Sequence, residues 1–343
     1  MRLRARPASV SEVADWDGLV EATGRPHLLQ LSGWAAVKAA TGWTARRFVI
    51  ADAGSAKPVG VAQVLLRSLP LGLSIAYAPR GPLVASEDLP DAIVALARAL
   101  AAQRCASLLC DPEEADAPSV HTALAAQGIR PAGIFVQPRR TLLLDLRPPP
   151  EELLGAMKKK TRQYIHKAER AGVVTEGTDD LDRYLAVLRR VAARDRFALH
   201  DRAYFQQIRS AFGDGVHLTI ARVGNDDVGA LLVVRRGDRA WEMYGGWSGE
   251  HADARPFYLL KWRSISRMRE LGAIRYDMWG LTEHGVSADR SVANDDPLAG
   301  VEQFKVGFGG DIVSWIGAVD VPVRAALYPL WRLAGRRRLA ASA

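Results

Sequence analysis

The chain of 343 residues repeats one pattern of elements, and this repeat limits its possible folds more than any other feature. Segments 50–67 and 220–235 each hold two apolar runs joined by a short turn with glycine and charged residues, as in a β-hairpin. Each hairpin is followed by a segment with helical periodicity, at about 89–104 and 256–271, and then by a short apolar strand. The copies keep an offset of about 170 residues, so we interpret the chain as a duplication.

Each copy alternates strands with a helix, which predicts an α/β (α+β) fold of two domains, each a mixed sheet flanked by helices. We place the boundary at the three prolines 148–150, giving a first domain over 1–150 and a second over 151–343 that includes a basic tail. We expect ligands in a cleft between the domains. Segment 282–300, rich in Asp, Ser, Asn and Gly, is expected to form a mobile loop beside that cleft.

Composition excludes several classes of protein. With 48% apolar and 24% charged residues, the chain is not a disordered one. Its two cysteines, Cys105 and Cys110, are too few for a disulfide framework and are expected to be inert thiols of an apolar strand. No apolar run approaches the ~18 residues of a membrane helix, which favours a cytoplasmic protein. The seven histidines show no metal-ligand spacing, so we expect no metal site.

The positive charge is concentrated in two places. The chain has 46 Lys and Arg against 38 Asp and Glu, a net charge of +8. Segment 156–172 holds six cations and one acid, and the last twenty residues hold five arginines and no acid. We expect a helix over 153–171 facing tRNA or precursor phosphates, and 323–338 resting on the anionic inner membrane leaflet. The alternative for both segments is an ordinary solvated surface.

Five segments in matching order resemble the Fem family of peptidoglycan aminoacyltransferases: 30–38, 78–82, 157–169, 258–280 and 295–310. In this family two acetyltransferase-like (GNAT) domains move an amino acid from aminoacyl-tRNA to the stem peptide of a cell-wall precursor. The resemblance implies the same fold, with aminoacyl-tRNA as co-substrate and no further cofactor. Because no long heptad-patterned insertion follows Ala168, the chain resembles the compact form without a coiled-coil arm.

The resemblance also implies which residues serve the chemistry. Amine attack on the ester of aminoacyl-tRNA builds negative charge on the carbonyl oxygen, and a fixed cation can stabilise it. Lys305, before a glycine-rich turn, is the candidate for that cation, and its alternative is a surface lysine. Asp277, at the end of a predicted strand, is a candidate base or orienter of the amine.

Other residues are candidates for binding the precursor. The resemblance assigns Lys38 to its diphosphate, with an ordinary helix-face lysine as the alternative. The family often has arginine four residues before the position of Tyr204, where this chain has His200, and Arg202 is a candidate replacement. Further candidates, with core packing as the alternative for the tyrosines, are Arg80, His200, Tyr204, Tyr244, Tyr258 and Phe304.

The expected partners are aminoacyl-tRNA and a UDP-linked or lipid-linked muropeptide precursor, bound by a monomer. One alternative is a GNAT-type N-acyltransferase that uses acyl-CoA. Segments 80–82 and 244–247 lack the spacing of the glycine-rich pyrophosphate loop that such enzymes use, which disfavours this alternative. A second alternative is a non-catalytic protein that binds RNA or a membrane surface.

Overall fold

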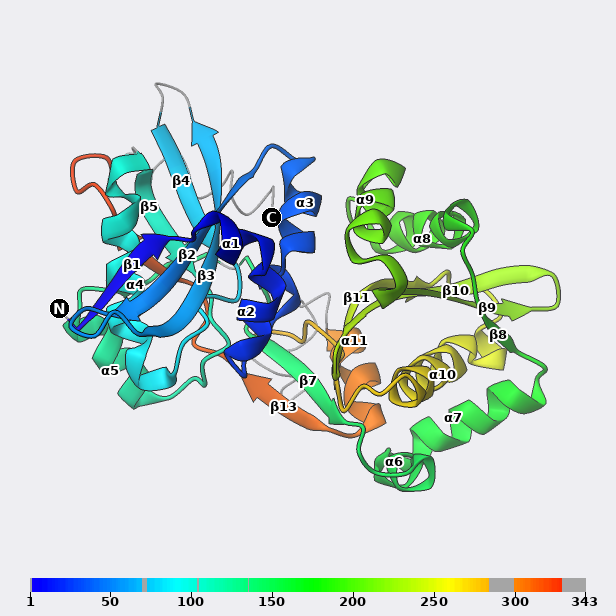
Figure 1. The fold of residues 1–343 in the computed structure, drawn as a ribbon. Helices are drawn as coiled ribbons and strands as arrows, with labels where there is room; N and C mark the ends of the chain where they lie inside the picture. Colours follow the sequence, from blue (N-terminus) through cyan, green and yellow to red (C-terminus); the bar gives the residue numbers. More distant parts are fainter. Residues whose placement is uncertain (1, 70–72, 104, 135, 284–298, 329–343) are drawn as a thin grey trace. The chain divides into compact units, whose positions relative to one another are not determined.

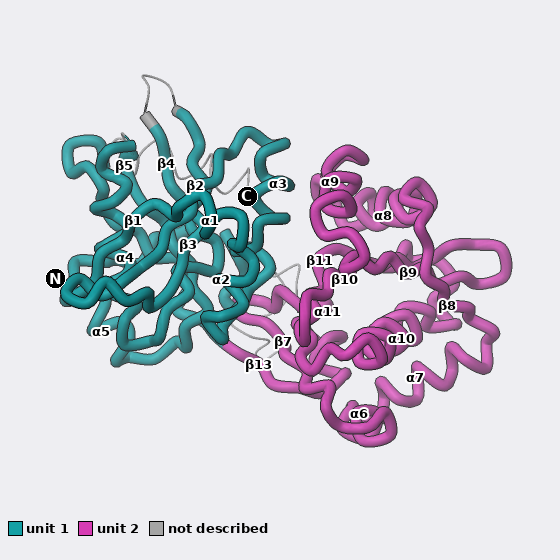
Figure 2. Tube along the Cα trace, in the orientation of Figure 1, with its two compact units in different colours: residues 1–139, 314–343 teal, residues 140–313 magenta. Residues whose placement is uncertain are grey.

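The structure, a computed structural model, describes residues 2–69, 73–103, 105–134, 136–283 and 299–328. The chain forms two compact units (Figure 2). Unit 1 contains residues 1–139 and 314–343, and unit 2 contains residues 140–313. The C-terminal segment therefore returns to the unit in which the chain began.

Unit 1 is built on a seven-stranded sheet with the order β1-β2-β3-β4-β5-β14-β6 (Figure 1). Its neighbouring strands are antiparallel except for the parallel pair β4 and β5. The strands are β1 (Leu3–Pro7), β2 (Thr44–Asp52), β3 (Pro58–Leu69), β4 (Leu73–Ala78), β5 (Cys105–Cys110), β6 (Arg130–Pro131) and β14 (Val319–Pro322). The helices are α1 (Val10–Ala14), α2 (Trp16–Ala22), α3 (Ser32–Ala39), α4 (Leu89–Ala99) and α5 (Pro118–Ala126).

The two faces of this sheet differ in chemistry. Side chains alternate along β3 because successive residues of a strand point to opposite faces. Ala62 and Val64 belong to the apolar core that includes buried residues of α4. Gln63, between them, instead uses its side-chain amide to donate to the carbonyl of Leu31 (2.8 Å), just before α3. One face thus packs the apolar core with α4, and the other combines the buried apolar residues Val61 and Leu65 with the polar Gln63.

Unit 2 is built on a second seven-stranded sheet, with the order β13-β7-β12-β11-β10-β9-β8. The strands are β7 (Arg140–Asp145), β8 (Val174–Gly177), β9 (Val216–Val223), β10 (Asp226–Arg236), β11 (Arg239–Trp247), β12 (Arg275–Asp277) and β13 (Asp311–Ser314). The helices are α6 (Pro150–Ala156), α7 (Lys159–Arg170), α8 (Leu181–Asp195), α9 (Arg202–Phe212), α10 (Pro256–Glu270) and α11 (Ala299–Lys305). Figure 1 shows α8 and α9 on one face of this sheet and α7 and α10 on the other.

The predicted duplication is confirmed. The series β2, β3, β4, α4, β5 in unit 1 has the same order and strand senses as β9, β10, β11, α10, β12 in unit 2. In both series the last two strands are parallel. The predicted α/β fold of mixed sheets flanked by helices is likewise confirmed.

The division of the chain differs from the predicted boundary at 148–150. Strand β7 precedes that boundary in sequence but pairs with β12, and the N–H of Leu146 donates to Ile274, so the chain enters unit 2 at residue 140. Strand β14 lies late in the chain but pairs with β5 and β6 of unit 1. Each sheet therefore takes one strand, second from its edge, from the other half of the sequence.

The helix predicted over 153–171 is in fact two helices, α6 and α7. Met157 is extended between them, because the N–H of Lys158 donates to the carbonyl of Gly307 (2.9 Å) and not within a helix. The guanidinium of Arg162 bonds the carbonyl of Gly155 (3.0 Å) at the end of α6. These contacts stabilise a break that helical periodicity does not reveal.

Both cysteines are buried in β5, as predicted, and burial raises the pKa of Cys105 to about 11. Residues 284–298 and 329–343 lie outside the described residues. They include most of the predicted mobile loop, the start of the 295–310 segment and much of the predicted membrane-facing segment 323–338. In the described part of the chain, no helix has both the length and the apolar character needed to cross a bilayer.

Candidate active site

Lys305 ends α11 and is buried, which excludes the alternative of a surface lysine. Its Nζ donates to the carbonyls of Trp279 (2.7 Å) and Gly280 (2.8 Å), in the turn that follows β12. Burial lowers the pKa of Lys305 to about 8, against the opposing effect of the negative charge of Glu242. The structure thus fixes this ammonium group in position.

Asp277 is the last residue of β12 and stabilises the same turn. Its carboxylate accepts hydrogen bonds from the hydroxyl of Thr141 on β7 and from the N–H of Trp279 (2.7 Å). Trp279 has a φ of +55°, a conformation that is unfavourable for a bulky residue, and the bond to Asp277 helps to hold it. These contacts stabilise the turn, and the roles of Asp277 as base or orienter of the amine stay predictions.

A buried ionic network surrounds Lys305, and sequence reasoning missed it. Glu242 on β11 forms an ion pair with Lys261 on α10 and accepts a hydrogen bond from the hydroxyl of Tyr276 (3.1 Å). Glu302 on α11 pairs with Arg140 (3.1 Å). Both acids contribute to the electrostatic surroundings of Lys305.

The sequence held one signal for this network. Glu242 interrupts an apolar run over 240–244, and Lys261 interrupts another in the helix predicted at about 256–271. A charged group inside an element is costly to bury unless it is paired. Two opposite charges so placed therefore indicate a buried pair.

A β-bulge in β11 separates Glu242 from Tyr244. In the register with β10, Leu232 opposes Tyr244 and Val233 opposes Glu242, so Met243 is the extra residue. Residues two apart in a regular strand share a face. Here Glu242 contacts α10 and Tyr244 contacts α9, helices on opposite faces of the sheet (Figure 1).

Three of the predicted precursor-binding residues lie together on the α9 side of this sheet. The hydroxyls of Tyr204 and Tyr244 are 3.1 Å apart, and the His200 ring stacks on Tyr204 with centroids 3.9 Å apart. Burial raises the pKa of both tyrosines. Arg202, the candidate replacement cation, instead pairs with Asp182 at the surface (2.8 Å) and does not join this cluster.

Tyr258 and Phe304 lie in a second aromatic cluster. Their ring centroids are 4.8 Å apart, and Tyr258 also contacts Tyr164 of α7 edge to face at 4.9 Å. The ammonium of Lys261 lies 5.9 Å from the Phe304 ring. This cluster therefore connects the buried ionic network with α7.

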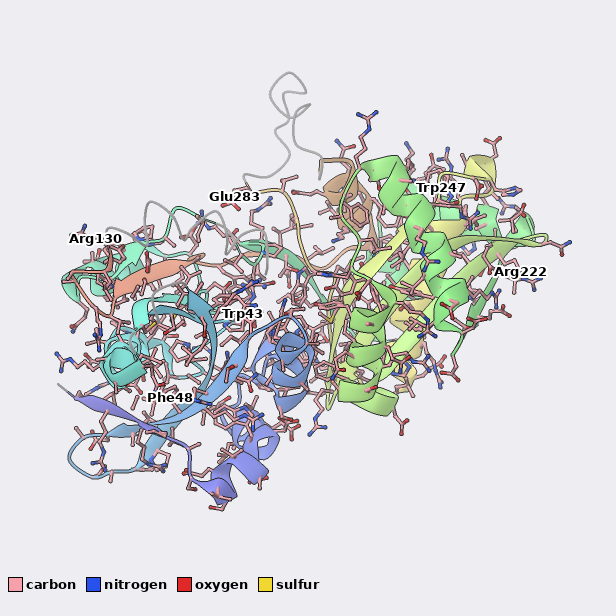
Figure 3. All side chains as sticks on the ribbon, turned by 90° about the horizontal axis from the view of Figure 1, so that it is seen from above. Trp43, Phe48, Arg130, Arg222, Trp247 and Glu283 are labelled. Atoms are coloured by element: carbon pink, nitrogen blue, oxygen red, sulfur yellow. The ribbon has the colours of Figure 1, made fainter. Side chains whose placement is uncertain are left out.

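Lys38, in unit 1, is buried and lies near a second cation. Its Nζ is 5.0 Å from the centroid of Trp34, and the guanidinium of Arg67 on β3 is 5.6 Å from the ring of Trp43, labelled in Figure 3. Burial first, and the charge of Arg67 second, lower the pKa of Lys38 to about 8. The indole N–H groups of Trp34 and Trp43 are buried and donate to no acceptor among the described residues.

Arg80 follows β4 and is also buried, with a φ of +50°. Its N–H donates to Asp111 (2.6 Å) and its guanidinium to the carbonyl of Pro138 (2.8 Å). Asp111 also accepts a bond from Tyr77 (2.7 Å), and burial raises the pKa of Asp111 to about 6. Arg80 and Asp111 therefore form an internal network, and sequence reasoning missed the acid.

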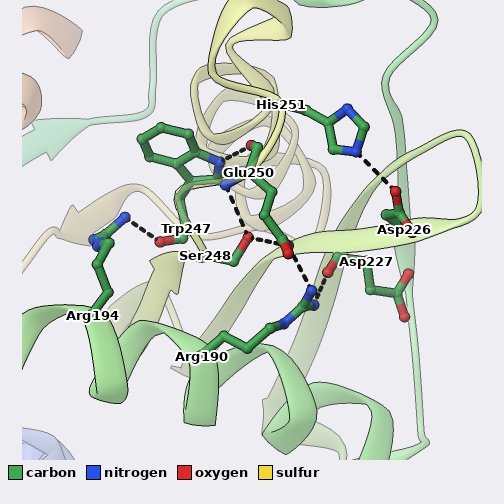
Figure 4. A network of polar contacts seen from close by, with 8 residues as sticks. All are labelled: Arg190, Arg194, Asp226, Asp227, Trp247, Ser248, Glu250 and His251. Carbon is green, nitrogen blue, oxygen red and sulfur yellow. Dashed lines mark hydrogen bonds and ion pairs between the residues drawn. The ribbon is translucent and has the colours of Figure 1, made fainter.

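The connection between β11 and α10 is held by its own polar contacts (Figure 4). Arg190 of α8 bonds Glu250 (2.6 Å), and Arg194 bonds the carbonyl of Trp247 (2.6 Å). The Trp247 indole donates to the carbonyl of Glu250 (2.7 Å). Helix α10 then begins with Pro256, which has no N–H to donate.

The chain matches known proteins along nearly its whole length. The sequence model of the FemAB family matches residues 12–122, 127–228 and 223–336. Lipid II:glycine glycyltransferase of Staphylococcus aureus (strain MRSA252) is 24% identical over an alignment of 398 positions. The alignment covers 92% of this chain and 92% of the relative.

Solved structures show the same fold. FemX matches 96% of this chain and 99% of its own, with a TM-score of 0.81 and 21% identity. A tandem GNAT protein from the clavulanic acid biosynthesis pathway matches 94% of this chain and 99% of its own, with a TM-score of 0.54 and 16% identity. At such identities the likeness concerns the fold, and it confirms the predicted tandem GNAT-like architecture.

Proposed function

The chain belongs to the FemAB family, and from this premise we propose that it is an aminoacyltransferase that moves an amino acid from aminoacyl-tRNA to an amine of a lipid-linked peptidoglycan precursor. One observation carries the proposal. The likeness to lipid II:glycine glycyltransferase spans nearly all of both chains, so it includes both units and the segments that hold Lys38 and Lys305. The substrate in the name of this relative, lipid II, supports a lipid-linked acceptor over a UDP-linked one.

The proposed reaction needs little covalent chemistry from the protein. The acceptor amine attacks the ester carbonyl, the carbonyl oxygen becomes negative, and the ribose hydroxyl leaves with a proton. An enzyme accelerates such a step chiefly by positioning the reactants and stabilising the oxyanion. The buried, high-pKa state of Cys105 agrees with a reaction that uses no thiol nucleophile.

Lys305 is the group that we assign to the oxyanion. An ammonium has three N–H donors, and two of those on Lys305 bond the carbonyls of Trp279 and Gly280. The third is then the donor for a developing negative oxygen. Because the ammonium is already fixed, it needs no reorganisation during the reaction.

Lys38 is the group that we assign to the phosphates of the acceptor. Lys38 and Arg67 bring two positive charges close together in unit 1, and like charges repel unless an anion binds between them. No described carboxylate pairs with Arg67. A diphosphate would supply negative charge and several acceptor oxygens to this pair of cations.

Acyl-CoA is a weaker candidate donor. Pyrophosphate binding at a helix N-terminus uses free backbone N–H groups in a glycine-rich turn. In this chain α4 and α10, the helices that follow equivalent strands, both have proline in their first two positions. The preceding turn in unit 2 is occupied by the contacts of Arg190, Arg194 and Glu250.

The decisive experiment incubates the full chain with lipid II, a pool of charged tRNAs and isotope-labelled amino acids, and weighs the product by mass spectrometry. We expect lipid II to gain the mass of one or more amino acid residues, and we expect ribonuclease treatment to abolish the gain. A parallel reaction uses the UDP-linked precursor, and a third replaces the tRNA pool with acetyl-CoA. Product from acetyl-CoA alone would overturn the proposal, as would RNA binding without transfer to either acceptor.

A further inference from the structure

The start of α7 carries a group of cations that the fold does not use. Lys158, Lys159 and Lys160 are exposed, and within the described part of the chain no carboxylate pairs with them. The acid of this helix, Glu169, is held near its other end by His166 (3.1 Å) and Arg263 (3.0 Å). The three lysine charges are therefore available to a ligand.

These lysines are also badly placed for helix stability. The backbone dipoles of a helix make its N-terminus positive, so acids stabilise the first turn and cations destabilise it. The first turn of α7 has no acid, and its N-cap residue, Lys158, makes no side-chain capping bond. Because the arrangement does not favour the helix, a ligand is the better explanation of the charge.

Aromatic rings continue from these lysines toward the candidate active site. The ring of Tyr164 lies 5.6 Å from the ammonium of Lys160 and 4.5 Å from the guanidinium carbon of Arg255. Tyr164 contacts Tyr258, which contacts Phe304, the residue before Lys305. The Nε of Arg255 is buried and donates to no described acceptor. The two cations at Tyr164 and the three rings of Tyr164, Tyr258 and Phe304 thus lie along one path within unit 2.

This combination fits single-stranded RNA better than a membrane. A membrane-binding helix presents large apolar side chains to the lipid. Exposed large apolar residues of unit 2 occur elsewhere, and none lies within 150–171. Single-stranded RNA instead offers phosphates to lysines and base faces to tyrosine and arginine.

We propose that Lys158, Lys159, Lys160, Tyr164 and Arg255, together the α7 surface, bind the single-stranded 3′ end of the RNA that carries the donor amino acid. The lysines contact phosphates, and Tyr164 and Arg255 stack against bases. The RNA end would then run along Tyr258 and Phe304 toward Lys305. The choice of RNA rests on the proposed function, but the surface itself is defined by its charges and rings.

The test measures binding of the full chain to an RNA hairpin that has a four-nucleotide 3′ overhang and carries no amino acid. Binding is followed by fluorescence anisotropy at several salt concentrations. The variant Lys158→Gln/Lys159→Gln/Lys160→Gln should bind at least about 10-fold more weakly, with a log–log salt slope smaller by about 2. The control Arg4→Gln/Arg46→Gln/Lys57→Gln removes the same charge from exposed positions of unit 1 and should change affinity less than about 2-fold. Tyr164→Leu should weaken RNA binding several-fold with an unchanged salt slope. Tyr164→Phe keeps the ring and should retain the wild-type affinity.

Equal losses in the two triple variants would show a mere net-charge effect and would overturn the proposal. So would a lysine variant that binds RNA normally but no longer sediments with vesicles containing phosphatidylglycerol, because that result indicates a membrane surface. RNA binding requires neither acceptor nor transfer. Loss of the proposed function therefore appears as missing transfer product, whereas failure of the α7 surface appears in the anisotropy data alone.

Discussion

Two buried lysines, one in each unit, both have a pKa that burial lowers, but the charges around them differ. Lys305 lies among the acids Glu242, Asp277 and Glu302, which oppose the effect of burial, and two carbonyls hold its ammonium. Lys38 lies near a second cation, Arg67, which adds to the effect of burial. Both have a pKa of about 8.

The difference indicates what each lysine is ready to bind. The charge of Lys305 is balanced and its position fixed, as suits a group that must act on a small, transient negative charge. The surroundings of Lys38 and Arg67 favour a full anion that remains bound. On the proposed function, Lys305 is the fixed cation for chemistry, and Lys38 with Arg67 is the site for the acceptor phosphates.

The largest expected effect comes from breaking the charge balance around Lys305. Lys261→Met would leave the carboxylate of Glu242 buried without its cation, and we expect a loss of about 3–5 kcal/mol in the free energy of unfolding. Urea denaturation measures this loss. The double variant Lys261→Met/Glu242→Gln removes both charges and should recover most of it. Equal stability of the single variant and the wild type would contradict a buried ion pair.

Removing the fixed cation itself should affect chemistry more than binding. For Lys305→Met we expect kcat to fall about 100-fold, typical of losing one oxyanion donor, with an unchanged KM for the acceptor. The measurement is steady-state transfer with purified lipid II, after thermal denaturation has shown that the variant is folded. Gln303→Met, an exposed neighbour on α11, is the matched control and should retain the wild-type kcat. A raised KM with a normal kcat would show that Lys305 binds the acceptor and does not stabilise the oxyanion.

The lysine of unit 1 should show the opposite division. Lys38→Met removes a charge-assisted bond to the acceptor phosphates, so we expect its KM to rise about 10-fold with little change in kcat. A direct measurement is calorimetric binding of inorganic pyrophosphate, which should weaken in parallel. The control Ala39→Gln changes the neighbour of Lys38 on α3 and should leave the pyrophosphate affinity unchanged. Unchanged pyrophosphate affinity in Lys38→Met would exclude Lys38 from the phosphate site.

Local patterns predicted the parts of the fold that depend on neighbouring residues. The hairpins β2–β3 and β9–β10 were predictable because alternation and turn residues lie within one segment. The exchange of β7 and β14 was not, because the partners of these short strands lie far away in sequence. The break at Met157 likewise depends on a distant carbonyl, that of Gly307.

The candidate site shows the same limit. The resemblance to the Fem family indicated Lys38 and Lys305 from their local motifs, and the structure finds both buried. The local motifs did not indicate Glu242 and Lys261. Hydrophobic periodicity did not indicate them either, because it treats each charged residue as exposed and cannot show that a strand residue pairs with a helix residue. Nor could it reveal that Arg202 is held by Asp182, a contact between α8 and α9.

The smallest expected effect separates the two lysines by pH. Each must be protonated to act, so kcat should fall above about pH 8 through Lys305, and the acceptor KM should rise there through Lys38. Arg67→Gln removes a nearby positive charge, which raises the pKa of Lys38 and shifts the rise in KM to higher pH by less than about one unit. The kcat profile should not move, because the pKa of Lys305 depends on Glu242, Lys261, Asp277 and Glu302 of unit 2. The control Arg67→Lys keeps the charge and should leave both pH profiles in place. A shift of the kcat profile in Arg67→Gln would show that the two lysines titrate together, and the comparison between them would then fail.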